Sequence, residues 1–175
     1  MRRSLKLVPA LVVLGGVLVG APAAQAKESF ADDPLVGAWM VQTPGGPAMA
    51  VFSADGTVVQ GIPTTQSGPG GLTYVSAEVG TWEPTGDHTN HFTAVELLSD
   101  ANGVFTGTVT IDAYQRVSDD GQTFVSTEGT SVTIRDAAGN VVMVDSNNDH
   151  PAMGTRMSVG SPGLPEPSAA ASSAP

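Results

Sequence analysis

The sequence has 175 residues, no cysteine and a formal net charge of −10. Without cysteine the chain has no disulfide, no thiolate metal ligand and no cysteine nucleophile. The acidic balance disfavours contact with nucleic-acid phosphates or anionic lipid headgroups, because like charges repel, so nucleic acid is not an expected partner.

The first 26 residues have the pattern of an export signal. Three basic residues precede the apolar run 7–19, and Ala24-Gln25-Ala26 matches a small-residue cleavage site. The run has 13 residues, whereas a membrane-spanning helix needs roughly 20. We therefore expect cleavage after Ala26, no integral membrane span in the mature chain, and a secreted, periplasmic or cell-envelope exterior location. Cleavage leaves four Lys and Arg against 17 Asp and Glu, a net charge of −13.

The rest of the chain divides into three parts. Residues 27–34 form a short lead-in, residues 35–159 form one domain, and residues 160–175 form a tail rich in Pro, Ser and Ala. The domain is long enough to bury one hydrophobic core. The tail has too little apolar surface to offset the entropy of ordering, so we predict that it is disordered.

Short β-branched or aromatic runs separated by turn residues fill the domain, and helical periodicity is not sustained, which is typical of an antiparallel all-β fold. The expected strands cover 38–42, 48–53, 57–62, 72–82, 91–99, 104–117, 122–136, 141–144 and 152–159. Tight turns are expected at Asp55-Gly56, Asn102-Gly103, Asp120-Gly121 and Gly139-Asn140, where Gly or Asn accommodates positive φ. Closing such a meander removes its exposed edges, which predicts a single up-and-down antiparallel barrel of about eight strands.

Alternation predicts which side chains face the barrel interior. In 104–117 one face carries Phe105, Gly107, Val109, Ile111 and Ala113, and we expect this apolar face to point inward. In 72–82 one face carries Val75, Ala77 and Val79, and the other carries Tyr74, Glu78 and Trp82. Either face of this strand is compatible with the interior, so its orientation stays open.

Two motifs carry a resemblance to a known family. Leu35-Val36-Gly37-Ala38-Trp39 resembles the first motif of the lipocalins, and Gly154-Thr155-Arg156-Met157 resembles their closing strand. With a second G-x-W motif, Gly80-Thr81-Trp82, the chain is similar to short exported bacterial lipocalin-like proteins of the calycin superfamily. The resemblance implies a lipocalin-like barrel whose base is formed by Arg156 packed across Trp39, a contact worth about 0.5–2 kcal/mol. It also implies a cup for a small apolar molecule.

Candidate metal and catalytic residues are few. Asp87-His88-Thr89-Asn90-His91, with His150 elsewhere, lacks a complete zinc ligand set at credible spacing. The segment 145–149 begins like a calcium loop, but His150 and Arg156 stand where that motif needs Gly and Glu. We find no nucleophile elbow, phosphate loop or dinucleotide fingerprint. The sequence thus assigns no metal site, cofactor or catalytic residue.

Two mid-strand carboxylates, Glu96 and Glu128, are expected to point outward into solvent, since glutamate is seldom buried. If either faced the apolar interior, its pKa would rise and it would be able to act as an acid or base.

The pattern favours a protein that binds a small apolar or amphipathic molecule. The residues expected to contact that molecule are Phe52, Trp82, His91, Phe92, Val109, Ile111 and Phe124. A cyclase or isomerase type of barrel enzyme is an alternative, with His91, Glu96, Glu128 or Tyr114 as acid or base. A structural or inhibitory secreted protein is another. The sequence does not decide the ligand, the oligomeric state or whether the barrel is hollow.

Overall fold

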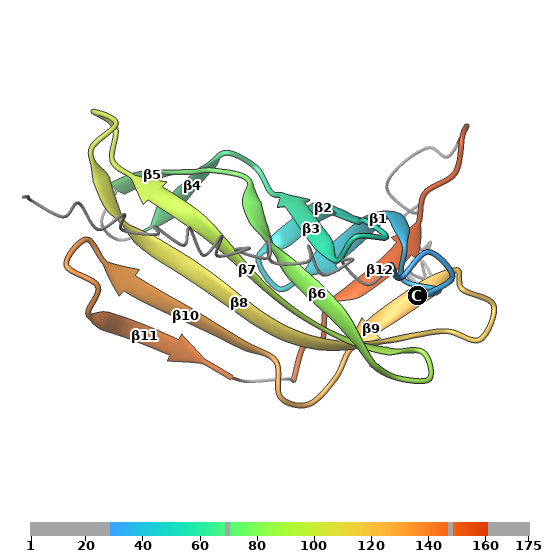
Figure 1. Cartoon of the computed structure of the whole chain (residues 1–175). Helices are drawn as coiled ribbons and strands as arrows, with labels where there is room; N and C mark the ends of the chain where they lie inside the picture. Colours follow the sequence, from blue (N-terminus) through green and yellow to red (C-terminus); the bar gives the residue numbers. More distant parts are fainter. Residues whose placement is uncertain (1–28, 69–70, 147–148, 161–175) are drawn as a thin grey trace, which may run out of the picture.

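The computed structural model describes residues 29–68, 71–146 and 149–160. Within these ranges the chain forms strands and turns without a helix, so the predicted all-β class is confirmed (Figure 1). The predicted signal peptide lies outside the described residues, as does the tail beyond Gly160. The strands are β1 (Gly37–Thr43), β2 (Gly46–Phe52), β3 (Thr57–Gly61), β4 (Thr65–Gly68), β5 (Gly71–Val75), β6 (Glu78–Gly86), β7 (Thr89–Ser99), β8 (Phe105–Val117), β9 (Thr123–Ser126), β10 (Ser131–Asp136), β11 (Val141–Asp145) and β12 (Met153–Arg156).

Eight of these strands form a closed antiparallel barrel in the order β1-β2-β3-β6-β7-β8-β9-β12. The last strand closes the ring on the first, with Arg156 opposite Trp39. Because the ring order follows the chain order, the predicted up-and-down barrel is confirmed. The pair β5-β4 extends from β7, and the pair β10-β11 extends from β8. Both extensions lie at one end of the barrel, on the left in Figure 1, away from β9 and β12.

Three strand predictions are wrong in detail. The expected strand 72–82 is two strands, because the chain breaks at Ser76-Ala77 and β5 and β6 pair with different parts of the sheet. The expected strand 122–136 is also two strands, because the turn between β9 and β10 contains Gly129 at a φ of 92°. Both halves still pair with the long strand β8. Finally, β4 lies between the expected strands 57–62 and 72–82, where the sequence pattern predicts no strand.

The predicted hairpin turns are present. Gly56, Gly103, Gly121 and Gly139 have φ between 68° and 85°, where glycine is favoured because it lacks a Cβ. Their turns are closed by backbone hydrogen bonds such as Gly56 N to Ser53 O, 3.0 Å.

Aromatic side chains fill one half of the barrel interior. The ring of Phe52 packs against the rings of Trp82, Phe92 and Phe124, with centroids 6.0, 5.7 and 6.4 Å away. Trp39 packs edge-on against Phe124 at 5.0 Å. All five rings are buried and belong to one hydrophobic core. This half of the barrel is therefore occupied by the protein's own side chains.

The base of the barrel explains the Gly-x-Trp motif. Arg156 lies over the Trp39 ring, 4.3 Å from its centroid, and donates hydrogen bonds to the carbonyls of Pro34, Val36 and Gly121. A Cβ at Gly37 would stand 2.5 Å from Arg156 Nη1, and Gly37 has a φ of 141°. Only glycine at this position leaves both the backbone conformation and the space that the guanidinium needs.

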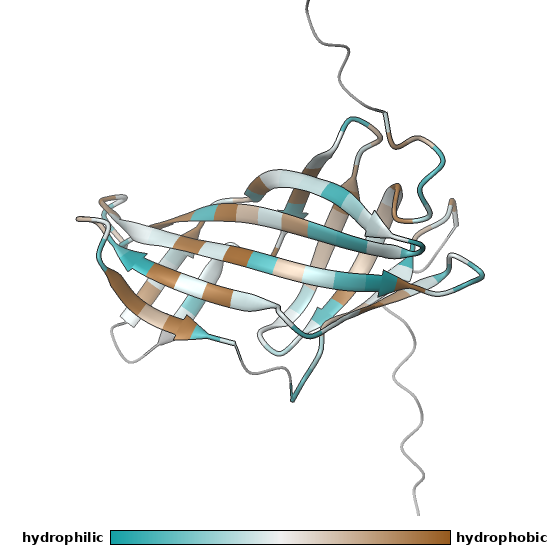
Figure 2. Ribbon diagram, turned by 60° about the horizontal axis from the view of Figure 1, so that its bottom comes forward, coloured by the Kyte–Doolittle hydropathy of each residue, from teal (hydrophilic) through white to brown (hydrophobic). Residues whose placement is uncertain are grey.

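Hydrophobic and hydrophilic residues alternate along the barrel strands (Figure 2). On β8 the predicted inward row is mostly correct, since Gly107, Val109 and Ala113 are buried and Ile111 is half-buried. The inward prediction for Phe105 is wrong. That side chain is 47% exposed, because β8 begins there and its register with β7 shifts at Ser99, so the strand pair ends beside it.

The orientation of β6, which alternation leaves open, is set in the structure. Glu78 and Trp82 are buried and face the interior, whereas Val79 is 55% exposed on the outer wall. A carboxylate thus lies inside the barrel, four residues from Trp82 on the same face of β6. Among the described residues, none belongs to a helix that is long and apolar enough to cross a membrane.

Candidate functional site

The seven residues predicted to contact a ligand do not form one site. Phe52, Trp82, Phe92 and Phe124 pack against one another or their neighbours in the aromatic core. Ile111 packs against the edge of this core, and Val109 lies one inward-facing position further along β8, opposite Glu96. His91 lies on the outer wall. The half of the interior beyond the aromatic core is lined by a different set of residues.

This second half has an apolar wall that is incompletely covered. Val109 is buried, but Leu98, Ile111, Val132 and Ile134 are only half-buried. They are neighbours, because Ile134 pairs with Val109 and Val132 pairs with Ile111 across β8 and β10. The wall lies where β10 joins β8, at the extended end of the barrel in Figure 1.

Polar side chains lie beside this wall, at the level of Val109, and Ile111 separates that level from the aromatic core, against which it packs. Glu78, Glu96 and Gln60 are 3%, 4% and 8% exposed. Gln60 pairs with Glu78 across β3 and β6, and Glu96 pairs with Val109 across β7 and β8. Since Val79 pairs with Val95, one further step of the same antiparallel register brings Glu78 opposite Glu96, where directly opposed Cβ atoms are about 5 Å apart. We call Gln60, Glu78 and Glu96 the interior polar row.

The interior polar row lacks internal hydrogen-bond partners. Glu78 Oε2, Glu96 Oε2 and Gln60 Nε2 are all buried and make no hydrogen bond within the described residues, and Gln115 Nε2 further along β8 is in the same condition. Buried polar atoms are nearly always paired, because an unpaired one costs about 1–3 kcal/mol. These atoms are therefore an exception that calls for a functional account.

Burial raises the pKa of both glutamates, and like charge adds to the shift of Glu78. Burial, and then the neighbouring charge of Glu96, raise the pKa of Glu78 from 4.5 to about 7. Burial also raises the pKa of Glu96. In the described residues no ion pair joins a basic side chain to either carboxylate. The basic side chains of the described residues have other partners or are exposed. Arg156 lies over Trp39, Arg135 at the Gly139 carbonyl, His88 near the Ser118 carbonyl and His91 at Asp112, and Arg116 and His150 are exposed.

The outward prediction for Glu96 is wrong, because Glu96 alternates with the core residues Phe92 and Ala94 on β7 and so shares their face. Glu128 is exposed, as expected, but it lies in the turn between β9 and β10 and not within a strand. The sequence indicates Glu96 and Glu128, and not Glu78, as possible acids or bases. The spacing of four residues between Glu78 and Trp82 was the available signal, since positions i and i+4 share one face of a strand.

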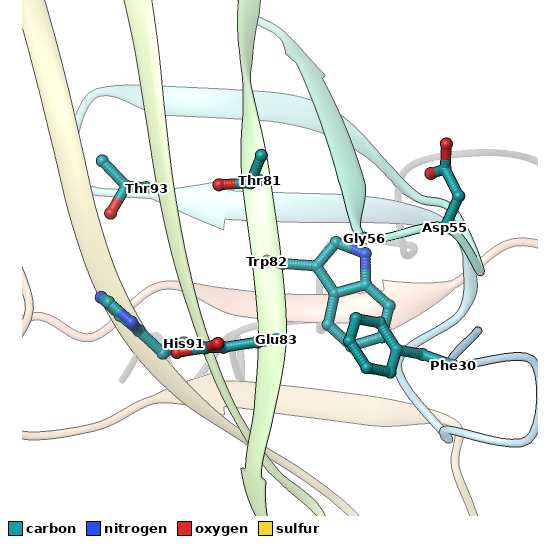
Figure 3. A pocket seen from close by; sticks show the side chains of 8 residues that line it. All are labelled: Phe30, Asp55, Gly56, Thr81, Trp82, Glu83, His91 and Thr93. Atoms are coloured by element: carbon teal, nitrogen blue, oxygen red, sulfur yellow. The ribbon is translucent and has the colours of Figure 1, made fainter. Parts of the chain in front are cut away.

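His91 belongs to a pocket on the outer wall, with a volume of about 340 Å³. Figure 3 shows the residues that line it, Phe30, Asp55, Gly56, Thr81, Trp82, Glu83, His91 and Thr93. His91 Nε2 lies 2.8 Å from Asp112 Oδ1, and the Thr93 hydroxyl donates to Asp112 Oδ2. The ring of Tyr114 stacks on the His91 ring at 4.3 Å. His91 and Tyr114 are thus held on the outside of the barrel, separated from Glu96 by the wall itself.

The candidate metal residues are not brought together. His91 is engaged with Asp112, and His88 Nδ1 lies 3.2 Å from the Ser118 carbonyl. Across 29–68, 71–146 and 149–160, no group of three or more His, Cys, Asp or Glu side chains is arranged to hold a metal ion. The calcium-loop-like segment 145–149 includes residues 147–148, which lie outside the described ranges.

Comparisons with protein-family models, curated proteins and solved structures return no match for this chain. The closed eight-stranded antiparallel barrel is consistent with a calycin-like fold. Function therefore has to be argued from the site itself.

Proposed function

We propose that this chain is an exported binding protein for a small amphipathic molecule, held inside the barrel in contact with the interior polar row and the adjoining apolar wall. The export-signal pattern of residues 1–26 supports the location. The stacking of Arg156 on Trp39 supports the finer likeness to exported lipocalin-like proteins, because it joins the two motifs on which that likeness depends.

The observation that carries the proposal is the set of buried polar atoms without partners. Glu78, Glu96 and Gln60 are more than nine-tenths buried, and each keeps an unpaired polar atom within the described residues. The polar group of a ligand is able to supply the missing hydrogen bonds and so offset the cost of burying these atoms.

The apolar wall supports the second half of the proposal. Small-molecule sites are commonly apolar surfaces with a few convergent polar groups. Leu98, Ile111 and Ile134 leave part of their apolar surface uncovered next to the interior polar row. The aromatic core offers no comparable opportunity, because its rings already contact one another.

Replacing Ile111 with Trp should block binding, because Ile111 is only half-buried and a larger side chain there covers the exposed part of the wall. We expect Nile red, an uncharged dye that brightens in apolar surroundings, to bind the purified protein saturably. Ile111→Trp should weaken that binding about tenfold or more, a loss of roughly 1.4 kcal/mol. The matched control is Val59→Trp, on the outer wall, where Val59 is 42% exposed. Equal dye affinity in both variants would place the dye elsewhere, and no saturable binding at all would favour a structural or inhibitory protein.

A second candidate function is acid–base catalysis on a small hydrophobic substrate by the same carboxylates. The observation that favours it is the pKa of Glu78 near 7, since an acid or base works best when its pKa is close to the ambient pH. A bound molecule recovered chemically unchanged after long incubation supports binding alone, whereas its isomerisation, lost in Glu78→Gln, supports catalysis.

A further inference from the structure

We infer that the polar group of the bound molecule is a cation, of the class of protonated organic amines, seated between Glu78 and Glu96. The inference rests on the proposed function and specifies its ligand. It follows from the arrangement of charges and hydrogen-bonding atoms in the interior polar row.

Glu78 and Glu96 carry like charges when both are ionised. Glu78 and Glu96 are opposite each other on adjacent strands, and like charges in such positions destabilise a sheet. A buried carboxylate also needs a compensating charge. The described part of the chain provides none, because its basic side chains are engaged or exposed elsewhere. Either a proton or a cation from outside the chain is then required, and the two compete for the same oxygens.

The hydrogen-bonding groups of the interior polar row match those of a primary ammonium. A primary ammonium has three N–H donors and no acceptor, and an ionised carboxylate only accepts. Glu78 Oε2 and Glu96 Oε2 are the unpaired acceptors. Gln60, beside Glu78, carries an amide with both functions, so it is able to accept from the ammonium through Oε1 and donate to a carboxylate through its unpaired Nε2. One ammonium group therefore satisfies all three residues.

The apolar wall beside the interior polar row favours an organic cation over a metal ion. A metal ion would make no use of the uncovered apolar surface of Leu98, Ile111 and Ile134. The interior polar row offers two carboxylates and one amide, fewer oxygen ligands than calcium usually takes. An amine with an apolar body uses both parts of the site, with charged hydrogen bonds at one end and buried hydrocarbon at the other.

The affinity for an amine should depend on pH. The inward-facing neighbours on the surrounding strands are Ala50 of β2, Val75 of β5 and Val109 of β8, none of which ionises, together with Gln60 of β3. Asp145 shares the inner face but lies on β11, three strands from Glu96, and is exposed. Asp136 shares the inner face of β10 with Ile134, but its carboxylate accepts hydrogen bonds from the backbone N–H groups of Ala138 and Asn140 in the adjacent turn. Glu78 and Glu96 are thus the buried titrating groups of the site. Protonation at acid pH removes their negative charge, so amine affinity should rise as pH rises.

The test compares three probes with the same hydrocarbon chain and different charge, namely octylamine, octanol and octanoate, by isothermal titration calorimetry. Near pH 8 we expect octylamine to bind about tenfold or more tightly than octanol, because charge-assisted hydrogen bonds are the stronger kind, and octanoate to bind least. Between about pH 8 and about pH 5.5 octylamine affinity should fall about thirtyfold, as Glu78 takes up a proton. Octanol affinity should not fall with it.

The decisive variant is Glu78→Gln with Glu96→Gln, which should abolish the preference for octylamine while octanol still binds. The double variant relieves like-charge repulsion, so we expect it to fold. The matched control, Glu83→Gln, removes a carboxylate from the outer wall and should leave the preference intact. Octanol binding as tightly as octylamine would overturn the cation inference and leave the binding function standing. If none of the three probes binds, both fail. Zinc or calcium displacing octylamine at stoichiometric concentration would replace the amine by a metal.

Discussion

Trp39→Ala should lower the free energy of unfolding by about 3–5 kcal/mol, the usual cost of removing a large buried aromatic side chain. Trp39 has no exposed surface, packs edge-on against Phe124 and donates a hydrogen bond from Nε1 to the Leu35 carbonyl at 2.8 Å. The substitution therefore leaves a cavity and an unpaired carbonyl and removes the surface on which Arg156 stacks. Equilibrium denaturation by urea measures the loss.

Arg156→Ala should cost less than Trp39→Ala, and the two changes together should cost less than the sum of the single effects. The reason is that the guanidinium and the indole are in contact, and residues in contact couple. Arg135→Ala is the matched control, because Arg135 is exposed and donates to the carbonyl of Gly139 in a turn. Strict additivity of Trp39→Ala and Arg156→Ala would contradict the contribution of their stacking to the base of the barrel.

Stability should fall as pH rises from about 4.5 to about 7, by an amount on the order of 3 kcal/mol from Glu78 alone. The folded state holds the Glu78 proton up to pH about 7, whereas the unfolded chain releases it near 4.5. In this window the folded state binds more protons than the unfolded state, so raising the pH favours unfolding. The raised pKa of Glu96 acts in the same direction.

Urea denaturation at several pH values measures this slope. Glu78→Gln should flatten it and make the protein more stable than the parent near pH 8. The control Glu128→Gln alters an exposed turn residue and should leave the slope unchanged. A parent protein that becomes more stable between about pH 5 and about pH 8 would show that Glu78 is not buried as a proton-holding carboxyl.

The parts of the fold that the sequence predicts well are local. The turn glycines require positive φ, and the Gly37-x-Trp39 motif with Arg156 needs only the closing of β12 on β1 to form its contact. These features follow from the conformational freedom of glycine and from a motif with a known packing. These features do not depend on how the other strands of the sheet pair.

The interior polar row was not predicted, because it depends on register between distant strands. Burial preference assigns Glu96 to the outside, and alternation leaves the face of Glu78 undecided. Only the pairings across β3, β6, β7 and β8 bring Gln60, Glu78 and Glu96 into one line. The same limit explains the ligand residues. Phe52, Phe92 and Phe124 are apolar and face inward, as expected. Their rings contact one another across different strands, so the sequence of any single strand does not predict these contacts.

Native mass spectrometry of protein purified from its own host tests most directly whether the barrel interior holds a small molecule at Glu78 and Glu96. We predict one species heavier than the polypeptide by the mass of a single small organic molecule. In the Glu78→Gln, Glu96→Gln double variant, expressed in the same host, that added mass should be lost. Parent and variant both at the bare polypeptide mass, or both carrying the same added mass, would contradict the claim.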